Sequence, residues 1–204
     1  MPEDGHRKYV AVTYFLVEMK ALTLLLDVAA DHGGYIPTRV ARARGMAPGR
    51  LVTLAHRGAL ERIGHGLYRL PGFPVGQHDD LLRAVLWTNG RGAISNETAL
   101  ALHDLADVNP TAIDISVPAD YRIGRAGAEN YRVHRHLDER NTRTIEGVCV
   151  VDAMTAILGS MEQGVGHALI SDAIDTARRL GWITRQQAED ARTQAHNVLC
   201  LQTT

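Results

Sequence analysis

The spacing of glycine and proline within a basic segment constrains the fold of this chain most strongly. Residues 38–70, TRVARARGMAPGRLVTLAHRGALERIGHGLYRL, contain seven arginines and one glutamate. Thr38 suits the N-cap of a short helix, and Gly45 suits its C-terminal end. Pro48 suits the first position of a second helix, which Gly58 then ends. The segment therefore predicts two short helices joined by a tight turn.

A β-hairpin is predicted directly after these helices. Residues 60–63 and 67–70 flank Gly64-His65-Gly66, a three-residue connection whose glycines can adopt positive φ. Before the basic segment, apolar residues recur with helical spacing over residues 17–30, and Gly33-Gly34 stops the run. A helix, a helix-turn-helix and a hairpin together are the outline of a winged helix-turn-helix domain.

Charge is distributed unevenly along a chain whose formal net charge is only −1. Residues 1–37 have a net charge of −2, residues 38–70 of +6 and residues 71–204 of −5. The global charge therefore gives no indication of a nucleic-acid partner, whereas the confined positive charge does. A basic surface by itself is also typical of a solvated face, so the interpretation depends on the arrangement of the helices, the turn and the hairpin.

The second helix of this motif, expected at residues 48–57, has two distinct faces. At about 100° per residue, Leu51, Leu54 and Ala55 share one face, which we expect to pack on the other helices. The opposite face suits a DNA groove, because hydroxyl and imidazole groups can bond base edges and a guanidinium can bond guanine or phosphate. The predicted DNA-binding residues are Arg39 and Arg42 on the first helix of the motif, Arg50, Thr53, His56 and Arg57 on the second, and Arg62, His65 and Arg69 on the hairpin.

The rest of the chain predicts a second domain of mixed helices and strands. Pro71, Gly72, Pro74 and Gly76 mark a linker. Beyond it we expect helices at 79–88, 97–105, 152–161, 166–180 and from residue 184, and strands at 112–117, 131–136 and 144–151. Asp152 can cap the helix that ends at residue 161, and Thr184 and Gln187 have the spacing of a capping box for the last helix. The predicted organisation is an N-terminal extension (1–18), a winged helix-turn-helix domain (19–76) and a C-terminal domain (77–204). The predicted fold class is α+β.

Composition places the chain among globular proteins of a reducing compartment. Hydrophobic residues make up 45% of the chain and charged residues 22%, which is close to the average for globular domains. Cys149 and Cys200 form no CxxC pair, which argues against a disulfide framework and favours a cytoplasmic location. The apolar stretch at residues 7–17 is too short to span a bilayer and lacks a cleavage site, so we expect no membrane or targeting role.

No combination of residues predicts an active site, a bound metal or a cofactor. His134 and His136 alternate on a predicted strand, but two ligands without a nearby cysteine or carboxylate do not make a metal site. His103 shares no helical face with a carboxylate and is expected to pack or to cap a helix. Gly124 and Gly127 lack the Lys-Ser/Thr continuation of a phosphate-binding loop. We therefore expect the protein to act by binding and not as an enzyme.

Three stretches of the chain resemble a known family. They are LLLDVAADHGGYIPTRVARARGMAPGRLVTLAHRGALERIGHGLYRLPG, AISNETALALHDLADVNPTAIDISVP and, more loosely, IEGVCVVDAMTAIL. In these stretches, over residues 19–160, the chain resembles AbiEi-type antitoxins, the DNA-binding components of type IV toxin-antitoxin systems, and in particular actinobacterial and mycobacterial members. GHGLYRLPG and ETALALHDL are the most recognisable parts. Asn96 is a departure, because relatives often carry His at this position.

The resemblance implies a transcriptional repressor that binds inverted repeats in its own promoter, beside a gene for a toxin of the nucleotidyltransferase fold. Two copies are then expected on the double-stranded operator, because one winged helix makes few base contacts. The C-terminal domain would neutralise the toxin or mediate assembly on DNA. The alternative is a protein-binding module that neutralises a partner by direct contact without sequence-specific DNA binding. A steep salt dependence of binding to DNA separates the two.

Overall fold

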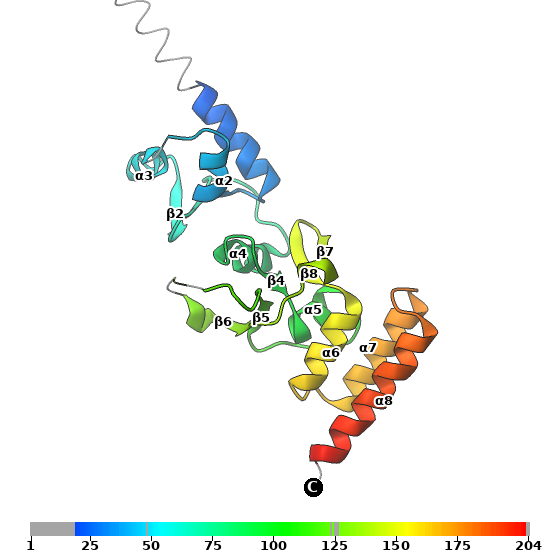
Figure 1. Cartoon of the computed structure of the whole chain (residues 1–204). Helices are drawn as coiled ribbons and strands as arrows, with labels where there is room; N and C mark the ends of the chain where they lie inside the picture. Colours follow the sequence, from blue (N-terminus) through cyan, green and yellow to red (C-terminus); the bar gives the residue numbers. More distant parts are fainter. Residues whose placement is uncertain (1–18, 48, 123, 125–126, 203–204) are drawn as a thin grey trace, which may run out of the picture. The chain divides into compact units, whose positions relative to one another are not determined.

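The computed structural model of the chain describes residues 19–47, 49–122, 124 and 127–202. It divides into two compact units, Met1–Asp79 and Asp80–Thr204 (Figure 1). The predicted N-terminal domain ends at residue 76, three residues before this division. The predicted extension at residues 1–18 and the predicted helix start at Pro48 lie outside the described residues.

The N-terminal unit has the element order of a winged helix-turn-helix (Figure 1). A helix described over residues 19–31 precedes three strands that form an antiparallel sheet in the order β1-β3-β2. The elements after this helix are β1 (Tyr35–Pro37), α2 (Thr38–Ala43), α3 (Arg50–His56), β2 (Glu61–Gly64) and β3 (Leu67–Arg69). The hairpin of β2 and β3 is the wing.

One apolar core holds these elements together. Leu25 and Val28 of the first helix are buried with Ile36 of β1, Leu51 of α3 and Tyr68 of β3. Burial of side chains of this size contributes about 1.5–3 kcal/mol each. The core therefore fixes α3 against the first helix and leaves its opposite face to solvent.

Thr38 does not cap α2 as the sequence predicts. Pro37 takes the N-cap position, Thr38 is the first helical residue, and no side chain makes a capping hydrogen bond. The Thr38 N–H instead donates to the Gly66 carbonyl in the turn of the wing, at 2.8 Å. A tertiary contact therefore satisfies a donor that a local cap would otherwise serve.

The C-terminal unit is built on a five-stranded mixed sheet in the order β6-β5-β4-β8-β7. Pairs β4–β8 and β5–β6 are parallel, whereas β4–β5 and β7–β8 are antiparallel. Its strands are β4 (Ala93–Ile94), β5 (Ile113–Ser116), β6 (Tyr131–His134), β7 (Thr142–Ile145) and β8 (Val148–Val151). Its helices are α4 (Asp79–Trp87), α5 (Asn96–Leu102), α6 (Ala153–Glu162), α7 (His167–Arg179) and α8 (Arg185–Gln202), with short 3-10 turns at Ala128–Asn130 and Glu139–Asn141.

The two faces of this sheet contact different helices. Tyr131 of β6 lies against Trp87 of α4, with ring centroids 4.8 Å apart. Asp114 of β5 instead hydrogen-bonds to Thr98 of α5 and to Gln163 at the end of α6. Beyond α6, helices α7 and α8 run side by side and pack on it (Figure 1).

The predicted strand at residues 144–151 is wrong in one respect, because it is a hairpin. β7 and β8 pair around Glu146 and Gly147, whose φ values of 47° and 83° reverse the chain. Two-residue hairpin turns usually have Asn-Gly, Asp-Gly or Gly-Gly at these positions. Here glycine is present at the second position, but the first is a glutamate, which is uncommon at positive φ. The two-residue strand β4 was not predicted, because it is too short to show a period.

Two of the predicted helix caps are confirmed. The Asp152 carboxylate accepts a hydrogen bond from the Thr155 N–H at 2.8 Å and so caps α6. Thr184 and Gln187 form a reciprocal capping box before α8, with hydrogen bonds of 2.8 and 3.2 Å.

Helices α5 and α6 approach closely at Asn96 and Gly159. Asn96 is 3% exposed and has a φ of 50°, which is uncommon for a residue other than glycine. A Cβ atom added to Gly159 would overlap the side-chain oxygen of Asn96 and lie 3.0 Å from its Cγ. The absence of a side chain at residue 159 therefore allows this contact.

His103 is a packed residue, as the sequence predicts. It is 3% exposed at the C-cap of α5, and its Nε2 donates to the Val151 carbonyl at 2.7 Å. Its Nδ1 is buried without a hydrogen-bond partner within the described residues. Burial lowers the pKa of His103 and the nearby Arg143 lowers it further, against the opposing effect of the Val151 hydrogen bond.

We expect His103 to make the C-terminal unit less stable in acid. Below the ordinary histidine pKa of about 6.5, the unfolded chain takes up a proton that folded His103 refuses. The free energy of unfolding then falls by up to about 1.4 kcal/mol per pH unit until the lowered pKa is reached. Trp87 and Trp182 both lie in this unit, so urea unfolding followed by tryptophan fluorescence from pH 7.5 to 5 measures the effect. In His103→Gln the fall in the free energy of unfolding attributed to His103 should disappear. In the control His65→Gln, where the histidine is exposed, it should remain. An unchanged pH profile in His103→Gln would show that His103 is not the source of the acid sensitivity.

None of the helices among the described residues is long and apolar enough to cross a membrane.

Candidate nucleic-acid interface

Helix α3 presents a polar and basic face to solvent. Leu51 is buried, and Leu54 and Ala55 are packed against the same core, as the helical pattern predicts. Thr53, His56 and Arg57 are exposed, whereas Arg50 is half-buried. The Thr53 hydroxyl donates to the Gly49 carbonyl at 3.2 Å, so it retains lone pairs that can accept a hydrogen bond from a base.

Gly49 adopts a conformation that favours glycine. It is the N-cap of α3, with φ 80° and ψ −15° in the left-handed region, and among the described residues beyond its chain neighbours no atom lies within 4 Å of the position of a Cβ. The chain therefore needs glycine here for backbone geometry. The same lack of a side chain leaves the start of α3 open to close approach by a DNA backbone.

The remaining predicted contacts lie on α2 and on the wing. Arg39 and Arg42 are exposed on α2, Arg62 is exposed on β2, and His65 is exposed in the turn of the wing. Within the described residues, Arg42, Arg57 and Arg62 have no carboxylate in ion-pair range. These three guanidinium groups are available to phosphate or base edges.

Two arginines of the basic segment already bind carboxylates of their own unit. Arg44 pairs with Asp31 at the end of the first helix at 2.6 Å, and this hydrogen bond lowers the pKa of Asp31. Arg69 pairs with Asp79 at 2.9 Å, and its side chain is only 12% exposed. Arg44 and Arg69 are therefore already committed within the protein, and the positive charge available to DNA includes that of Arg42, Arg57 and Arg62.

The structure does not favour the predicted role of Arg69 in DNA binding. Its guanidinium donates to the carbonyls of Phe73 and Pro74 at 3.2 and 3.3 Å and lies 5.0 Å from the centre of the Tyr35 ring. The Tyr35 hydroxyl donates to Asp79 at 2.8 Å. Arg69 therefore fixes the end of β3 to the chain that follows it, and we leave it out of the proposed interface.

We expect Arg69→Ala to destabilise the N-terminal unit by about 2–3 kcal/mol, because the poorly exposed Asp79 carboxylate loses its charged partner, although it keeps the hydrogen bond from Tyr35, and two carbonyls lose their donor. Urea unfolding followed by circular dichroism measures the change. Arg44→Ala is the matched control, since both members of its ion pair are exposed, at 40% and 56%, and it should cost less than about 1 kcal/mol. Equal effects of the two substitutions would show that Arg69 is an ordinary surface arginine.

Val52 was missed by the sequence analysis, although the helical pattern places it outside the buried face. It is 46% exposed on α3, next to Thr53 in the chain and one turn from His56. An exposed valine on such a helix offers a methyl surface that can contact the methyl group of thymine. The sequence could have indicated Val52 as a contact residue, because it is an apolar residue outside the face of the helix that is expected to be buried.

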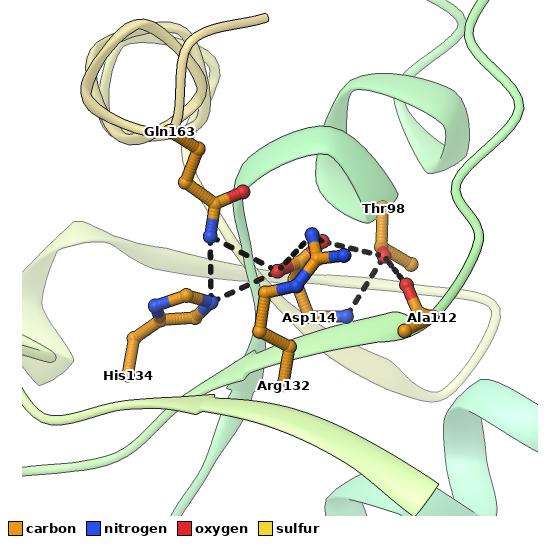
Figure 2. Close-up of polar contacts among 6 residues, drawn as sticks. All are labelled: Thr98, Ala112, Asp114, Arg132, His134 and Gln163. Carbon is orange, nitrogen blue, oxygen red and sulfur yellow. Dashed lines mark hydrogen bonds and ion pairs between the residues drawn. The ribbon is translucent and has the colours of Figure 1, made fainter.

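A second polar site lies in the C-terminal unit, around a buried carboxylate. Asp114 of β5 has a fully buried side chain and accepts hydrogen bonds from His134 at 2.9 Å, from Gln163 at 3.2 Å and from Arg132 at 3.3 Å (Figure 2). The Asp114 N–H donates to the Thr98 hydroxyl at 2.9 Å. The cluster therefore joins α5, the neighbouring strands β5 and β6, and the end of α6.

The proton position on His134 decides which contacts of this cluster are hydrogen bonds. Its Nε2 lies 2.9 Å from both the Asp114 carboxylate and the Gln163 amide nitrogen. One ring nitrogen cannot donate to the carboxylate and accept from the amide at the same time. Donation to Asp114 is the better assignment, because it pairs the buried charge.

In the sequence, His134 stands out only together with His136, as a possible metal pair. The two rings are 5.8 Å apart, and the described residues contain no group of three or more His, Cys, Asp or Glu able to hold a metal ion. The partner of His134 is Asp114, which the sequence analysis missed. The sequence predicted only a strand at residues 112–117, and α5 and α6 cover the face of the sheet on which Asp114 lies.

Part of the N-terminal unit is similar to a known family. Residues 24–71 match the family described as "Transcriptional regulator, AbiEi antitoxin". The AbiEi segment begins in the first helix and includes α2, α3 and both strands of the wing. Over residues 24–71 it confirms the resemblance to AbiEi antitoxins drawn from the sequence.

A solved structure shares the fold over most of the chain. The RV2827C protein from Mycobacterium tuberculosis is 13% identical in sequence, with a TM-score of 0.51 over 87% of this chain and 76% of that protein. At this identity the likeness concerns the fold alone, and it confirms the predicted α+β class. No curated protein sequence matches this chain.

Proposed function

We propose that this chain is the antitoxin of a type IV toxin-antitoxin system and represses its own promoter. The exposed basic face of α3, on a segment that matches a family of transcriptional regulators, is the observation that carries this proposal. In this role α3 enters the major groove, Arg39 and Arg42 of α2 hold the phosphate backbone, and the wing reaches the next phosphates. The mechanism is equilibrium binding, with no chemical step.

The operator should be an inverted repeat that binds two copies. The described part of α3 has only seven residues, so one copy reads few base pairs. Two copies in register need half-sites about 10 base pairs apart, which is one turn of DNA. A footprint of the promoter with the full chain should therefore show two protected half-sites with this spacing.

The partner in this proposal is a toxin of the nucleotidyltransferase fold encoded beside this gene. The C-terminal unit neutralises it, either by contact or by acting on the same target. The family description of the N-terminal segment as an antitoxin supports a toxin partner in general terms.

The proposal is tested by separating its two activities in the full chain. The promoter fragment and a scrambled duplex are compared in fluorescence anisotropy over a range of salt, and we expect tight, salt-dependent binding to the promoter alone. Growth rescue is then measured with toxin and antitoxin expressed from unrelated promoters. A chain that rescues growth without preferring the promoter would instead be the protein-binding module considered as the alternative.

A further inference from the structure

A basic pocket lies on the surface of the C-terminal unit, between α7 and α8. Its volume is about 470 Å³. Six charged residues line it: Asp175, Arg178 and Arg179 from α7, and Arg185, Glu189 and Arg192 from α8. α7 and α8 are packed side by side, so the pocket is formed by two regular helices (Figure 1).

The charge of this pocket is opposite to that of its domain. Residues 71–204 have a net charge of −5, whereas the six lining residues sum to +2. The pocket holds four of the twelve arginines of residues 71–204. A third of the positive charge of an acidic domain is therefore gathered at one place.

The two carboxylates neutralise only part of this charge. Arg185 pairs with Glu189 at 2.8 Å, one turn along α8, and Arg192 pairs with Asp175 across the two helices. The hydrogen bond from Arg185 lowers the pKa of Glu189, so this carboxylate stays ionised. Within the described residues, Arg178 and Arg179 have no ion pair.

Helix stabilisation explains only part of the arrangement. Arg178 and Arg179 occupy the last turn of α7, where positive charge stabilises the helix end. That role does not require arginines from α8 to face the same hollow. A guanidinium presents a planar set of donors that matches the oxygens of a phosphate, and several such groups together favour a ligand with more than one negative charge.

We propose that this pocket binds a group of neighbouring phosphates, carried either by the phosphate chain of a free nucleotide or by successive phosphodiesters of a nucleic-acid backbone. Arg178 and Arg179 make the first contacts, and the paired Arg185 and Arg192 add hydrogen bonds from the other helix. The site is separate from α3 and the wing, and it goes beyond the promoter binding proposed above.

The experiment uses the full chain and sodium tripolyphosphate as the probe, in calorimetric titrations at low and moderate salt. We expect saturable binding that weakens as salt rises, and a loss of affinity of at least about tenfold in the double variant Arg178→Gln/Arg179→Gln. Arg140→Gln is the control, because Arg140 is 88% exposed and paired with Asp138 outside the pocket. Arg185→Gln provides an independent test from α8 if the double variant is poorly folded in thermal melts.

Two results overturn the proposal. One is the absence of saturable binding in the wild-type chain, and the other is equal affinity in the wild type and in folded pocket variants. If tripolyphosphate binding is lost in Arg57→Ala but retained in the double variant, the ligand binds at α3 and not in the pocket, and the proposal is overturned. Titrations with ATP and with a random-sequence single-stranded oligonucleotide then distinguish a nucleotide site from a nucleic-acid contact.

Discussion

Replacing Arg57 by alanine is expected to weaken binding to the promoter by at least about fivefold for each copy of the protein. Arg57 is exposed at the C-cap of α3. A guanidinium that bonds one guanine contributes about 1–3 kcal/mol, and two copies on an inverted repeat lose this twice. Fluorescence anisotropy with the promoter duplex at fixed salt measures the change. Arg50→Ala should act in the same direction.

Arg57→Lys separates the two kinds of contact that an arginine can make. Lysine retains the charge but not the planar donors, so it preserves affinity if Arg57 binds phosphate and loses base selectivity if Arg57 reads guanine. Arg44→Ala is the matched control from the same segment, because Arg44 already pairs with Asp31. Unchanged affinity in both Arg50→Ala and Arg57→Ala would remove α3 from the proposed interface.

Replacing Asp114 by alanine should destabilise the C-terminal unit by about 3 kcal/mol, which is the largest stability change expected for this chain. The substitution leaves His134 and Gln163 without their buried acceptor and Arg132 without its partner. Removing one member of a buried ion pair usually costs about 3–5 kcal/mol, and the 42% exposure of Arg132 reduces this by letting its charge reach water.

Urea unfolding followed by tryptophan fluorescence measures this effect, since both tryptophans lie in the C-terminal unit. Glu139→Ala is a suitable control, because its contact with Arg91 is 3.5 Å long and both side chains are exposed; it should cost less than about 1 kcal/mol. A loss in Asp114→Ala no larger than in Glu139→Ala would mean that the cluster contributes little to folding.

The secondary structure of this chain follows from its sequence where local signals are strong. Gly45 and Gly58, with φ of 94° and 74°, mark the turns after α2 and α3, and the capping residues of α6 and α8 were predicted from their spacing. The hairpin of β7 and β8 was not, because its turn uses Glu146 at positive φ, where glutamate is uncommon.

The candidate interface could be predicted only in part, because charge along a sequence does not reveal its partners in space. Arg44 and Arg69 look like the other arginines of the segment, yet Asp31 and Asp79 bind them from positions 13 and 10 residues away. Asp114 was missed for a related reason. Alternation shows which residues share a face of a strand, but not whether helices will cover that face.

The fit between Asn96 and Gly159 has a consequence for how this chain can diverge. Any side chain at residue 159 would collide with Asn96, and a larger residue at 96 would press on the backbone of α6. The two positions are 63 residues apart, yet a side chain at residue 159 fits only if residue 96 becomes smaller. We expect the two positions to vary together among relatives, so that a side chain at 159, destabilising by itself, becomes acceptable beside a smaller residue at 96.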